Sequence, residues 1–200
     1  MNFDRLHRVA DWTNRPITPE MSQQLQVLTH WLATEATDAG GLGPAEVSRI
    51  FERHVLDSLV FAVGWGRDEP GRVLDIGTGV GLPLLPLAIT HPLSTFVGLD
   101  RSGRRIRLLR RAMRVLELGN IEPIECDVSG INDHFTYVVS RAAIPPAKLL
   151  PTLDRLVTPT GRGVVGGSPV KAPNVPGYQT VEIPPEVLDR PGWILMMARS

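Results

Sequence analysis

The sequence predicts an α/β fold, with a Rossmann-like, seven-stranded and mainly parallel sheet that carries helices on both faces. Two observations lead to this prediction. From residue 72 onward, short apolar runs alternate with helical stretches, which implies right-handed crossovers and parallel pairing. Before residue 72, apolar residues recur at steps of three and four, as in helices. We therefore divide the 200 residues into a small helical N-terminal region, residues 1–66, and an α/β domain, residues 67–200.

The N-terminal region is expected to contain two groups of helices. The first group holds the apolar positions Leu25, Leu28 and Leu32, and the second covers residues 50–62. Between them, residues 34–44 include three glycines and a proline, which predict a loop.

Seven apolar runs are the candidate strands of the sheet. The last two are separated by prolines and a glycine instead of a helical pattern, so we expect them to pair antiparallel at one edge. Residues 169–176 hold three prolines and are predicted to form a surface loop. The candidate strands are Val73–Ile76, Thr95–Leu99, Ile121–Cys126, Phe135–Ser140, Gly163–Val165, Tyr178–Ile183 and Trp193–Met197.

Composition excludes several classes of protein. No apolar run is long enough to span a bilayer, and the N-terminal residues lack the pattern of a signal peptide, so a cytoplasmic protein is expected. The single cysteine, Cys126, excludes an internal disulfide and a CxxC zinc knuckle. The five histidines show no metal-ligand spacing, and we predict no metal site. The net charge is zero, which provides no overall attraction to nucleic acid.

The strongest motif is residues 73–83, where an apolar strand runs into a glycine loop and then a helix. Gly77, Gly79 and Gly81 let the backbone turn sharply and lie against a ligand, while the helix that follows offers free N–H groups. The next strand ends at Asp100, whose carboxylate can accept both hydroxyls of an adenosine ribose. This order of elements predicts a site for a nucleoside cofactor.

The spacing of the glycines indicates which cofactor. A dinucleotide loop needs a third glycine where Leu82 or Leu84 stands, so NAD is disfavoured. The G-x-G-x-G pattern after Asp75 resembles motif I of class I S-adenosylmethionine-dependent methyltransferases. The resemblance implies S-adenosylmethionine as the cofactor, bound along the loop that includes Thr78, with Asp75 holding the loop and the amino-acid end of the cofactor.

Four segments, spread over roughly residues 50–166, resemble one family of such enzymes. The GidB/RsmG proteins of bacteria, which methylate N7 of a guanine in 16S ribosomal RNA, are similar to this chain in order and spacing. The resemblance implies ribosomal RNA, or the small ribosomal subunit, as the partner. The segments are residues 53–60 (RHVLDSLV), 76–89 (IGTGVGLP with PLAI), 120–123 (NIEP) and 139–142 (VSRA).

The resemblance also implies individual contacts. The family's cofactor contacts fall on Gly77, Leu82, Val128, Ser129 and Arg141. Arg141 is also the candidate catalytic residue, expected to organise either the cofactor carboxylate or the substrate; a salt bridge inside the fold is the competing interpretation.

The chain departs from the family pattern in four places, all of which fall on the substrate side. The usual Asn-Leu-Thr is replaced around residues 41–43, and Ser129 stands where an acid is common. Ala143 stands where an aromatic residue often follows Arg-Ala, and Gly166-Gly167 replaces a Lys-Gly pair. The cofactor assignment is therefore firmer than the RNA assignment.

The expected acceptor is consistent with what the sequence lacks. Guanine N7 presents an unprotonated lone pair, so positioning supplies most of the catalysis and no general base is needed. Cys126 does not follow a proline, as a cytosine-C5 nucleophile usually does. Ser140 is followed by Arg141 instead of the Pro-Pro-aromatic sequence of exocyclic-amine enzymes.

Two sets of polar residues lie on predicted helices, and their roles are not decided by the sequence. His54, Asp57 and Ser58 share one helical face, and we interpret them as a cluster that ties the N-terminal helices to the glycine-loop side of the sheet. A second helix is expected from an N-cap at Ser102 to a C-terminal signal at Gly119, with Ile106, Leu109, Met113 and Leu116 buried. Its basic ridge is either a solvated face or a surface that follows a phosphate backbone. The ridge consists of Arg104, Arg107, Arg111 and Arg114.

Three functions stay open from the sequence alone. The preferred one is an RNA guanine-N7 methyltransferase, and the first alternative is a diverged paralogue that methylates a small molecule. The second alternative is a cofactor-binding protein without transfer activity.

Overall fold

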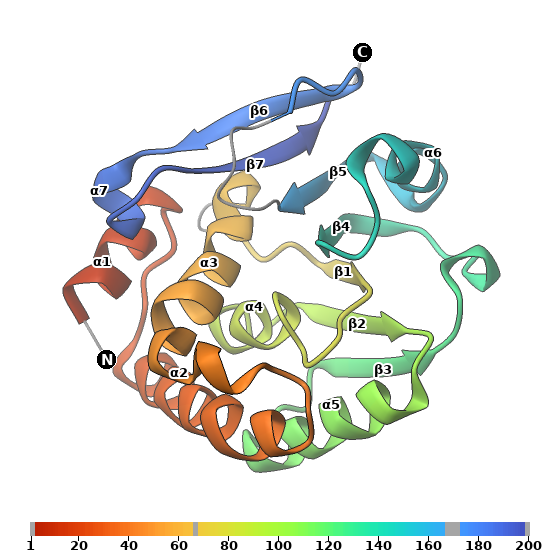
Figure 1. The fold of residues 1–200 in the computed structure, drawn as a ribbon. Coiled ribbons are helices and arrows are strands. Elements are labelled where there is room, and N and C mark those ends of the chain that lie inside the picture. Colours follow the sequence, from red (N-terminus) through yellow and green to blue (C-terminus); the bar gives the residue numbers. More distant parts are fainter. Residues whose placement is uncertain (1–2, 66–67, 167–172, 199–200) are drawn as a thin grey trace.

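The computed structural model describes residues 3–65, 68–166 and 173–198. It contains one seven-stranded sheet with helices around it (Figure 1). The strands are β1 Arg72–Ile76, β2 Thr95–Asp100, β3 Ile121–Glu125, β4 Phe135–Arg141, β5 Val157–Gly166, β6 Tyr178–Ile183 and β7 Gly192–Met197. The α-helices are α1 Phe3–Trp12, α2 Pro19–Trp31, α3 Leu56–Leu59, α4 Leu84–Thr90, α5 Gly103–Val115, α6 Pro146–Leu156 and α7 Pro185–Leu188. Short π or 3-10 turns are η1 Leu32–Ala36, η2 Pro44–Arg49, η3 Phe51–Val55, η4 Val60–Gly64 and η5 Val128–Gly130.

The sheet has the strand order β3-β2-β1-β4-β5-β7-β6. Strands β1 to β5 pair parallel, whereas β7 is antiparallel to both β5 and β6. The predicted seven-stranded, mainly parallel sheet with an antiparallel edge is confirmed. The order reverses between β1 and β4, and in open α/β sheets ligands bind at the carboxyl ends of the strands beside such a reversal.

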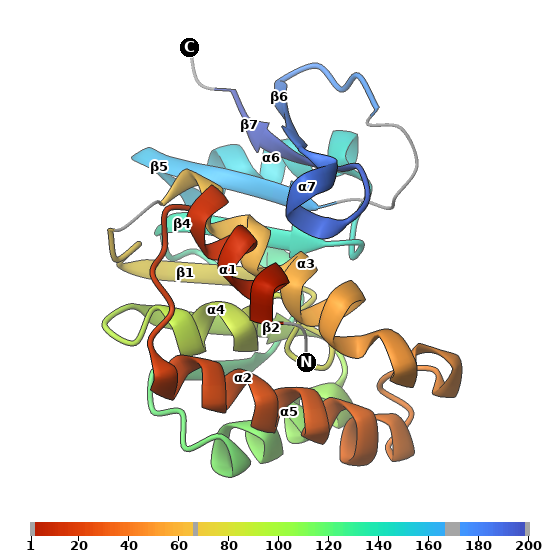
Figure 2. The same ribbon diagram turned by 90° about the vertical axis from the view of Figure 1, so that its left-hand side faces the viewer.

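Helices cover both faces of the sheet, but unequally. One face carries α4 and α5 together with the N-terminal helices, and the other is covered by α6 (Figure 2). Along β1 the side chains alternate as a pleated strand requires: Val73 belongs to the first apolar cluster, and Leu74 and Ile76 belong to the second.

The N-terminal helices share a core with the sheet. Leu25, Leu28, Trp31 and Phe61 are almost fully buried, in the same apolar cluster as Val73 of β1. The division at residues 66 and 67 stays a prediction, and those two residues lie outside the described ones. The shared core brings residues 41–58 to the sheet edge where the glycine loop lies.

The predicted start of the loop in the N-terminal region is wrong. The loop expected at residues 34–44 is shorter, because the helix continues as η1 and ends near Asp38. The buried side chains of Leu32 and Ala36 hold this extra turn against the core. The loop was predicted from the glycines and the proline that follow, which do not indicate where the helix ends.

The ends of α5 also differ from the prediction. Ser102 occupies the N-cap position, but its side chain makes no capping bond. The helix ends at Val115, and the left-handed residue is Glu117, with φ of 54°, instead of Gly119. Leu118 N–H then donates to the carbonyl of Met113 over 2.9 Å. Met113, expected to be buried, is only half-buried.

The fifth strand is longer than predicted. It spans Val157–Gly166 instead of residues 163–165, because its first part, interrupted by Pro159 and Gly161, still follows β4. The loop expected at 169–176 falls partly outside the described residues, and its described part, 173–176, lies outside helix and strand.

Gly166 explains one departure from the family pattern. A Cβ atom on this residue would lie 2.2 Å from the ring of Phe61, so no side chain fits here. The aromatic ring of η4 takes the space that a lysine would need. Gly167, the second residue of the departure, lies outside the described residues.

We predict that Phe61→Ala lowers the free energy of unfolding by about 3–5 kcal/mol, the range for truncating a buried aromatic residue. Phe61 is 1% exposed and packs between the N-terminal turns and β5. Urea denaturation measures the change. Phe3→Ala is the matched control, because Phe3 is 46% exposed and should cost less than about 0.5 kcal/mol. Equal losses in the two variants would contradict the shared core.

Candidate functional site

A cavity of about 540 Å³ opens at the carboxyl ends of β1, β2 and β4. Its wall comes from the glycine loop, the ends of the second to fourth strands and the turn before η2. The lining residues are Gly41, Leu42, Ile76, Gly77, Thr78, Gly79, Val80, Leu82, Leu99, Asp100, Arg101, Arg105, Cys126, Asp127, Val128, Arg141, Ala142, Ala143 and Ile144. Seven of the ten predicted site residues are therefore in its wall, and three are not: Asp75, Gly81 and Ser129.

The glycine loop needs its glycines for two different reasons. Gly77, Gly79 and Gly81 all have positive φ, of 73°, 58° and 90°, which disfavours other residues. A Cβ on Gly81 would collide with Leu85 at 2.4 Å, whereas a Cβ on Gly79 would meet no atom nearer than 3.9 Å. Gly81 is therefore needed because the loop packs closely against Leu85 of α4. At Gly79 the lack of a side chain keeps space open in the cavity.

Asp100 joins the second strand to the glycine loop. Its Oδ2 accepts the N–H of Gly79 over 3.0 Å, and its Oδ1 accepts the N–H of Ser102 over 2.9 Å. The side chain is 7% exposed and faces the cavity. Two fixed donors hold the carboxylate in one orientation, in which its remaining lone pairs can accept hydroxyls.

Asp75 is the most unusual ionisable group near the cavity. It is fully buried, and neither carboxylate oxygen has a hydrogen-bond partner among the described residues. The hydroxyl of Thr78, which lies in the cavity wall, is also buried without a partner. Burial raises the pKa of Asp75 to about 7, against the opposing effects of the nearby Thr78 hydroxyl and the Arg141 guanidinium.

The turn that follows the third strand lines the cavity with Val128, whereas the predicted Ser129 is not in the wall. Asp127 takes the place in the wall that was expected for Ser129. Its Oδ1 accepts the N–H of Ser129 over 2.9 Å, and this bond lowers the pKa of Asp127. An acid directly before Val128 was the signal that sequence reasoning missed.

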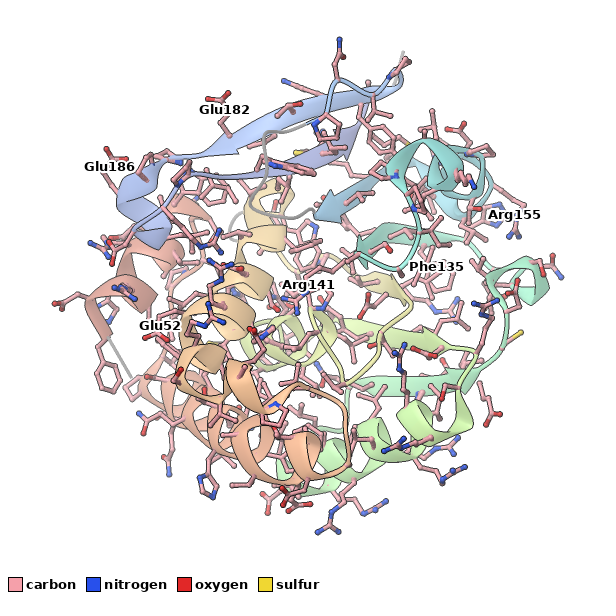
Figure 3. All side chains as sticks on the ribbon, in the orientation of Figure 1. Glu52, Phe135, Arg141, Arg155, Glu182 and Glu186 are labelled. Atoms are coloured by element: carbon pink, nitrogen blue, oxygen red, sulfur yellow. The ribbon has the colours of Figure 1, made fainter. Side chains whose placement is uncertain are left out.

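Arg141 ends the fourth strand, beside α3 near the centre of the molecule (Figure 3). Its Nη2 lies 3.2 Å from Nδ1 of His54, and its Nη1 lies 3.4 Å from the Ser58 hydroxyl. No carboxylate of the described residues lies within ion-pair distance of it. Burial lowers the pKa of Arg141, and the charges of Asp57 and Asp75 partly oppose this. The arrangement therefore differs from the salt bridge considered as the competing interpretation.

The predicted polar cluster on the N-terminal helices meets this arginine. His54 and Ser58 contact Arg141, as expected of a link to the glycine-loop side of the sheet. Asp57 instead pairs with Arg190, and its pKa is raised by burial.

Gly41 and Leu42, which the sequence analysis assigned to a loop and to the substrate side, also line the cavity. Gly41 N–H donates to the carbonyl of Ala36 over 2.7 Å, and a Cβ on Gly41 would lie 2.3 Å from Val80. Two residues of the first departure from the family pattern, Gly41 and Leu42, are thus part of the cavity wall.

Two of the four arginines of the basic ridge on α5 contact the N-terminal segment at the surface. Arg104 donates to the carbonyl of Ala39, and Arg111 pairs with Glu35. Arg107 and Arg114 are exposed. Arg104 and Arg111 therefore bind the N-terminal segment, and only Arg107 and Arg114 remain for either of the two interpretations, a solvated face or a phosphate-binding surface.

The described ranges hold neither a membrane-spanning helix nor a cluster of metal ligands. No helix in residues 3–65, 68–166 and 173–198 is long and apolar enough to cross a membrane. In the same ranges, no group of three or more His, Cys, Asp or Glu residues could hold a metal ion.

The residues present fit an adenosyl cofactor with a charged amino-acid end. Gly79 leaves the loop open towards the cavity, and Asp100 offers oriented acceptors. The unpartnered oxygens of Asp75 and the hydroxyl of Thr78 supply buried polar atoms that still lack a partner. Arg141, without an ion-pair partner among the described residues, can bind a carboxylate.

Comparison with solved structures defines the class of fold. A ribosomal protein L11 methylase from Lactobacillus delbrueckii superposes with a TM-score of 0.59 at 16% identity, over 74% of this chain and 79% of that one. A SAM-dependent methyltransferase from Aquifex aeolicus gives 0.55 at 17% identity, over 74% and 93%. The chain has the Rossmann-like fold of class I methyltransferases.

Sequence comparison then identifies the family. The chain belongs to the GidB family, rRNA small subunit methyltransferase G, whose family model matches residues 21–166. A ribosomal RNA small subunit methyltransferase G from Klebsiella pneumoniae is 32% identical over 142 residues, 70% of this chain and 67% of that protein. The homologue from Mycobacterium marinum is 48% identical over 88 residues, 44% of this chain and 38% of that protein. The chain thus spans less than half the length of some curated relatives that it matches.

We predict that Asp75→Asn removes a pH dependence of stability. Because folding raises the pKa of Asp75 from its usual 3.8 to about 7, the folded state holds a proton that the unfolded state releases between these values. The stability of the unsubstituted protein should therefore fall, relative to Asp75→Asn, by roughly 3 kcal/mol as pH rises from 4.5 to 8. Urea denaturation across this range measures it. Asp154→Asn, at an exposed position on α6, should keep the original slope, and a parallel slope in Asp75→Asn would contradict the assignment.

Proposed function

We propose that this protein is an S-adenosylmethionine-dependent methyltransferase that acts on N7 of a guanine in ribosomal RNA. The observation that carries the proposal is the cavity beside the glycine loop, where Asp100 is oriented by Gly79 N–H. Membership of the rRNA small subunit methyltransferase G family supports the acceptor. Such a protein works in the cytoplasm on the small ribosomal subunit or its RNA.

The cofactor-binding residues of the proposal are those predicted from the sequence, with different roles. Gly77, Thr78, Gly79 and Leu82 hold the cofactor through the loop, and Asp100 binds its ribose. Arg141 and Asp75 bind the amino-acid end. Gly81 and Ser129 shape the loop and the turn at η5, and Val128 packs beside the adenosine.

Bound S-adenosylmethionine supplies an electrophilic methyl group on a sulfonium. The protein's own task is then to position a nucleophile that already has a free lone pair. None of the described cavity residues is a histidine or lysine, and the lowered pKa of Asp127 makes it a weak base. A reaction at guanine N7 needs no base, which favours this acceptor. Arg141, at the end of β4, is the catalytic residue of the proposal, in contact with the cofactor or the acceptor.

A second candidate function is methylation of a small molecule. Gly41, Leu42 and Ala143 lie in the cavity wall, so two of the four departures from the family pattern fall on surfaces that an acceptor would meet. A cofactor-binding protein without transfer activity is the third possibility and is distinguished by the experiments below.

Loss of the loop or of its acidic partner should abolish cofactor binding. Gly79→Val places a strained side chain in the cavity, since Gly79 has φ of 58°, and Asp100→Ala removes the acceptor of its N–H. We expect each variant to weaken binding of S-adenosylhomocysteine at least about a hundredfold in calorimetry. Asp100→Ala loses the two hydrogen bonds from the ribose hydroxyls to the carboxylate, and the side chain in Gly79→Val takes space that the ligand needs. Asp154→Ala is the control and should bind normally. Unchanged affinity in both loop variants would refute the site.

The acceptor is tested with labelled S-adenosylmethionine and small ribosomal subunits that lack their native N7 mark. Label should enter the RNA, and binding to RNA should fall steeply with salt, because phosphate contacts release counterions. Label that enters a metabolite pool, without salt dependence, would identify the small-molecule alternative. Cofactor binding with no S-adenosylhomocysteine produced from any acceptor would identify a protein without transfer activity.

A further inference from the structure

A chain of hydrogen bonds connects Arg141 to the turn beside the cavity. Nη2 of Arg141 lies 3.2 Å from Nδ1 of His54, and Nε2 of the same imidazole lies 3.2 Å from Oε2 of Glu46. Glu46 belongs to η2 and His54 to η3, so the chain joins two N-terminal turns to the end of β4.

The two partners of His54 determine which nitrogen carries the proton. A guanidinium has only N–H donors, so Nδ1 must accept, whereas a carboxylate has only acceptors, so Nε2 must donate. His54 is therefore neutral, with its proton on Nε2. Burial, and next the charge of Arg141, lower the pKa of His54, which agrees with a neutral imidazole at pH 7.

Arg141 depends on this chain of hydrogen bonds for its orientation. Nη1 makes two further hydrogen bonds, to the carbonyl of His54 and the hydroxyl of Ser58, both at 3.4 Å. These are long, and no carboxylate of the described residues pairs with the guanidinium, so the 3.2 Å contact to His54 is its shortest hydrogen bond within the described residues. The arrangement leaves Nε–H and one N–H of Nη2 for a ligand in the cavity.

We infer that Glu46 and His54 are positioning residues, which hold Arg141 in the orientation that binds the carboxylate of the cofactor. The inference rests on the proposed function. Glu46 acts through His54, by fixing the tautomer, and His54 acts through Arg141, by accepting its Nη2–H. Neither His54 nor Glu46 is in the cavity wall, so neither touches the ligand.

Two substitutions of His54 separate positioning from general stability. His54→Asn keeps an oxygen acceptor close to the place of Nδ1 and loses the bond to Glu46, whereas His54→Gln keeps a polar atom at the place of Nε2 and loses the acceptor for Arg141. We expect His54→Gln to weaken binding of S-adenosylhomocysteine about tenfold, the effect of one hydrogen bond to a charged group. His54→Asn should restore most of this loss, and His30→Gln, exposed on α2, is the control.

The tautomer is measured in the protein without cofactor. In nitrogen-15 spectra of the imidazole at pH 7, Nε2 of His54 should be protonated and Nδ1 unprotonated. Glu46→Ala removes one of the two partners that fix the tautomer, so it should raise the fraction of His54 protonated on Nδ1 and weaken S-adenosylhomocysteine binding severalfold. Glu46→Gln, which keeps an oxygen acceptor, should restore part of the affinity.

Several results would overturn the inference. These are a proton on Nδ1 in the unsubstituted protein, equal affinities in His54→Gln and His54→Asn, or unchanged affinity in His54→Gln. If the unsubstituted protein binds no cofactor, the proposed function fails and the orienting role fails with it; the nitrogen-15 spectrum then shows separately whether the hydrogen-bond chain exists.

Discussion

Burial of both faces of the parallel sheet is the constraint on which the rest of the structure depends. One face is completed by the N-terminal helices, whose Leu28, Trp31 and Phe61 share a cluster with the sheet. Parallel strands need this cover because their side chains are apolar on both sides. The same packing brings η2 and η3 next to the end of β4, so the layer that completes the core also supplies partners for Arg141.

The site combines groups that a folded protein normally avoids. Asp75 is buried with both oxygens unpartnered among the described residues, and Arg141 is largely buried without a carboxylate in that same set. Each arrangement costs free energy in the protein alone. The ligand of the proposed function, with an ammonium and a carboxylate, would supply partners of opposite charge and so offset this cost. This link between stability and ligand chemistry is why the pH dependence of Asp75 is informative about the site.

The departures from the family pattern have local physical causes where the structure describes them. Gly166 is required by the ring of Phe61, and Gly41 is required by Val80. These glycines belong to the packing of this chain, so they do not by themselves remove a function. Ala143 lies beside Gly77 in the cavity wall, where a larger side chain would reduce the space for an acceptor.

The sequence by itself determined the strands, their mainly parallel pairing and the loop from Gly77 to Gly81, because these depend on local periodicity and backbone freedom. The place of Asp100 beside that loop, in the cavity wall, followed from its position at the end of the next strand. Only the tertiary structure decided which polar groups meet. Asp127, instead of Ser129, lines the cavity, Arg104 and Arg111 contact Ala39 and Glu35 at the surface, and Glu46 reaches Arg141 through His54. The contacts of Arg104, Arg111 and Arg141 join residues 65, 76 and 87 positions apart. No local pattern encodes them, since packing of the N-terminal layer on the sheet brings them together.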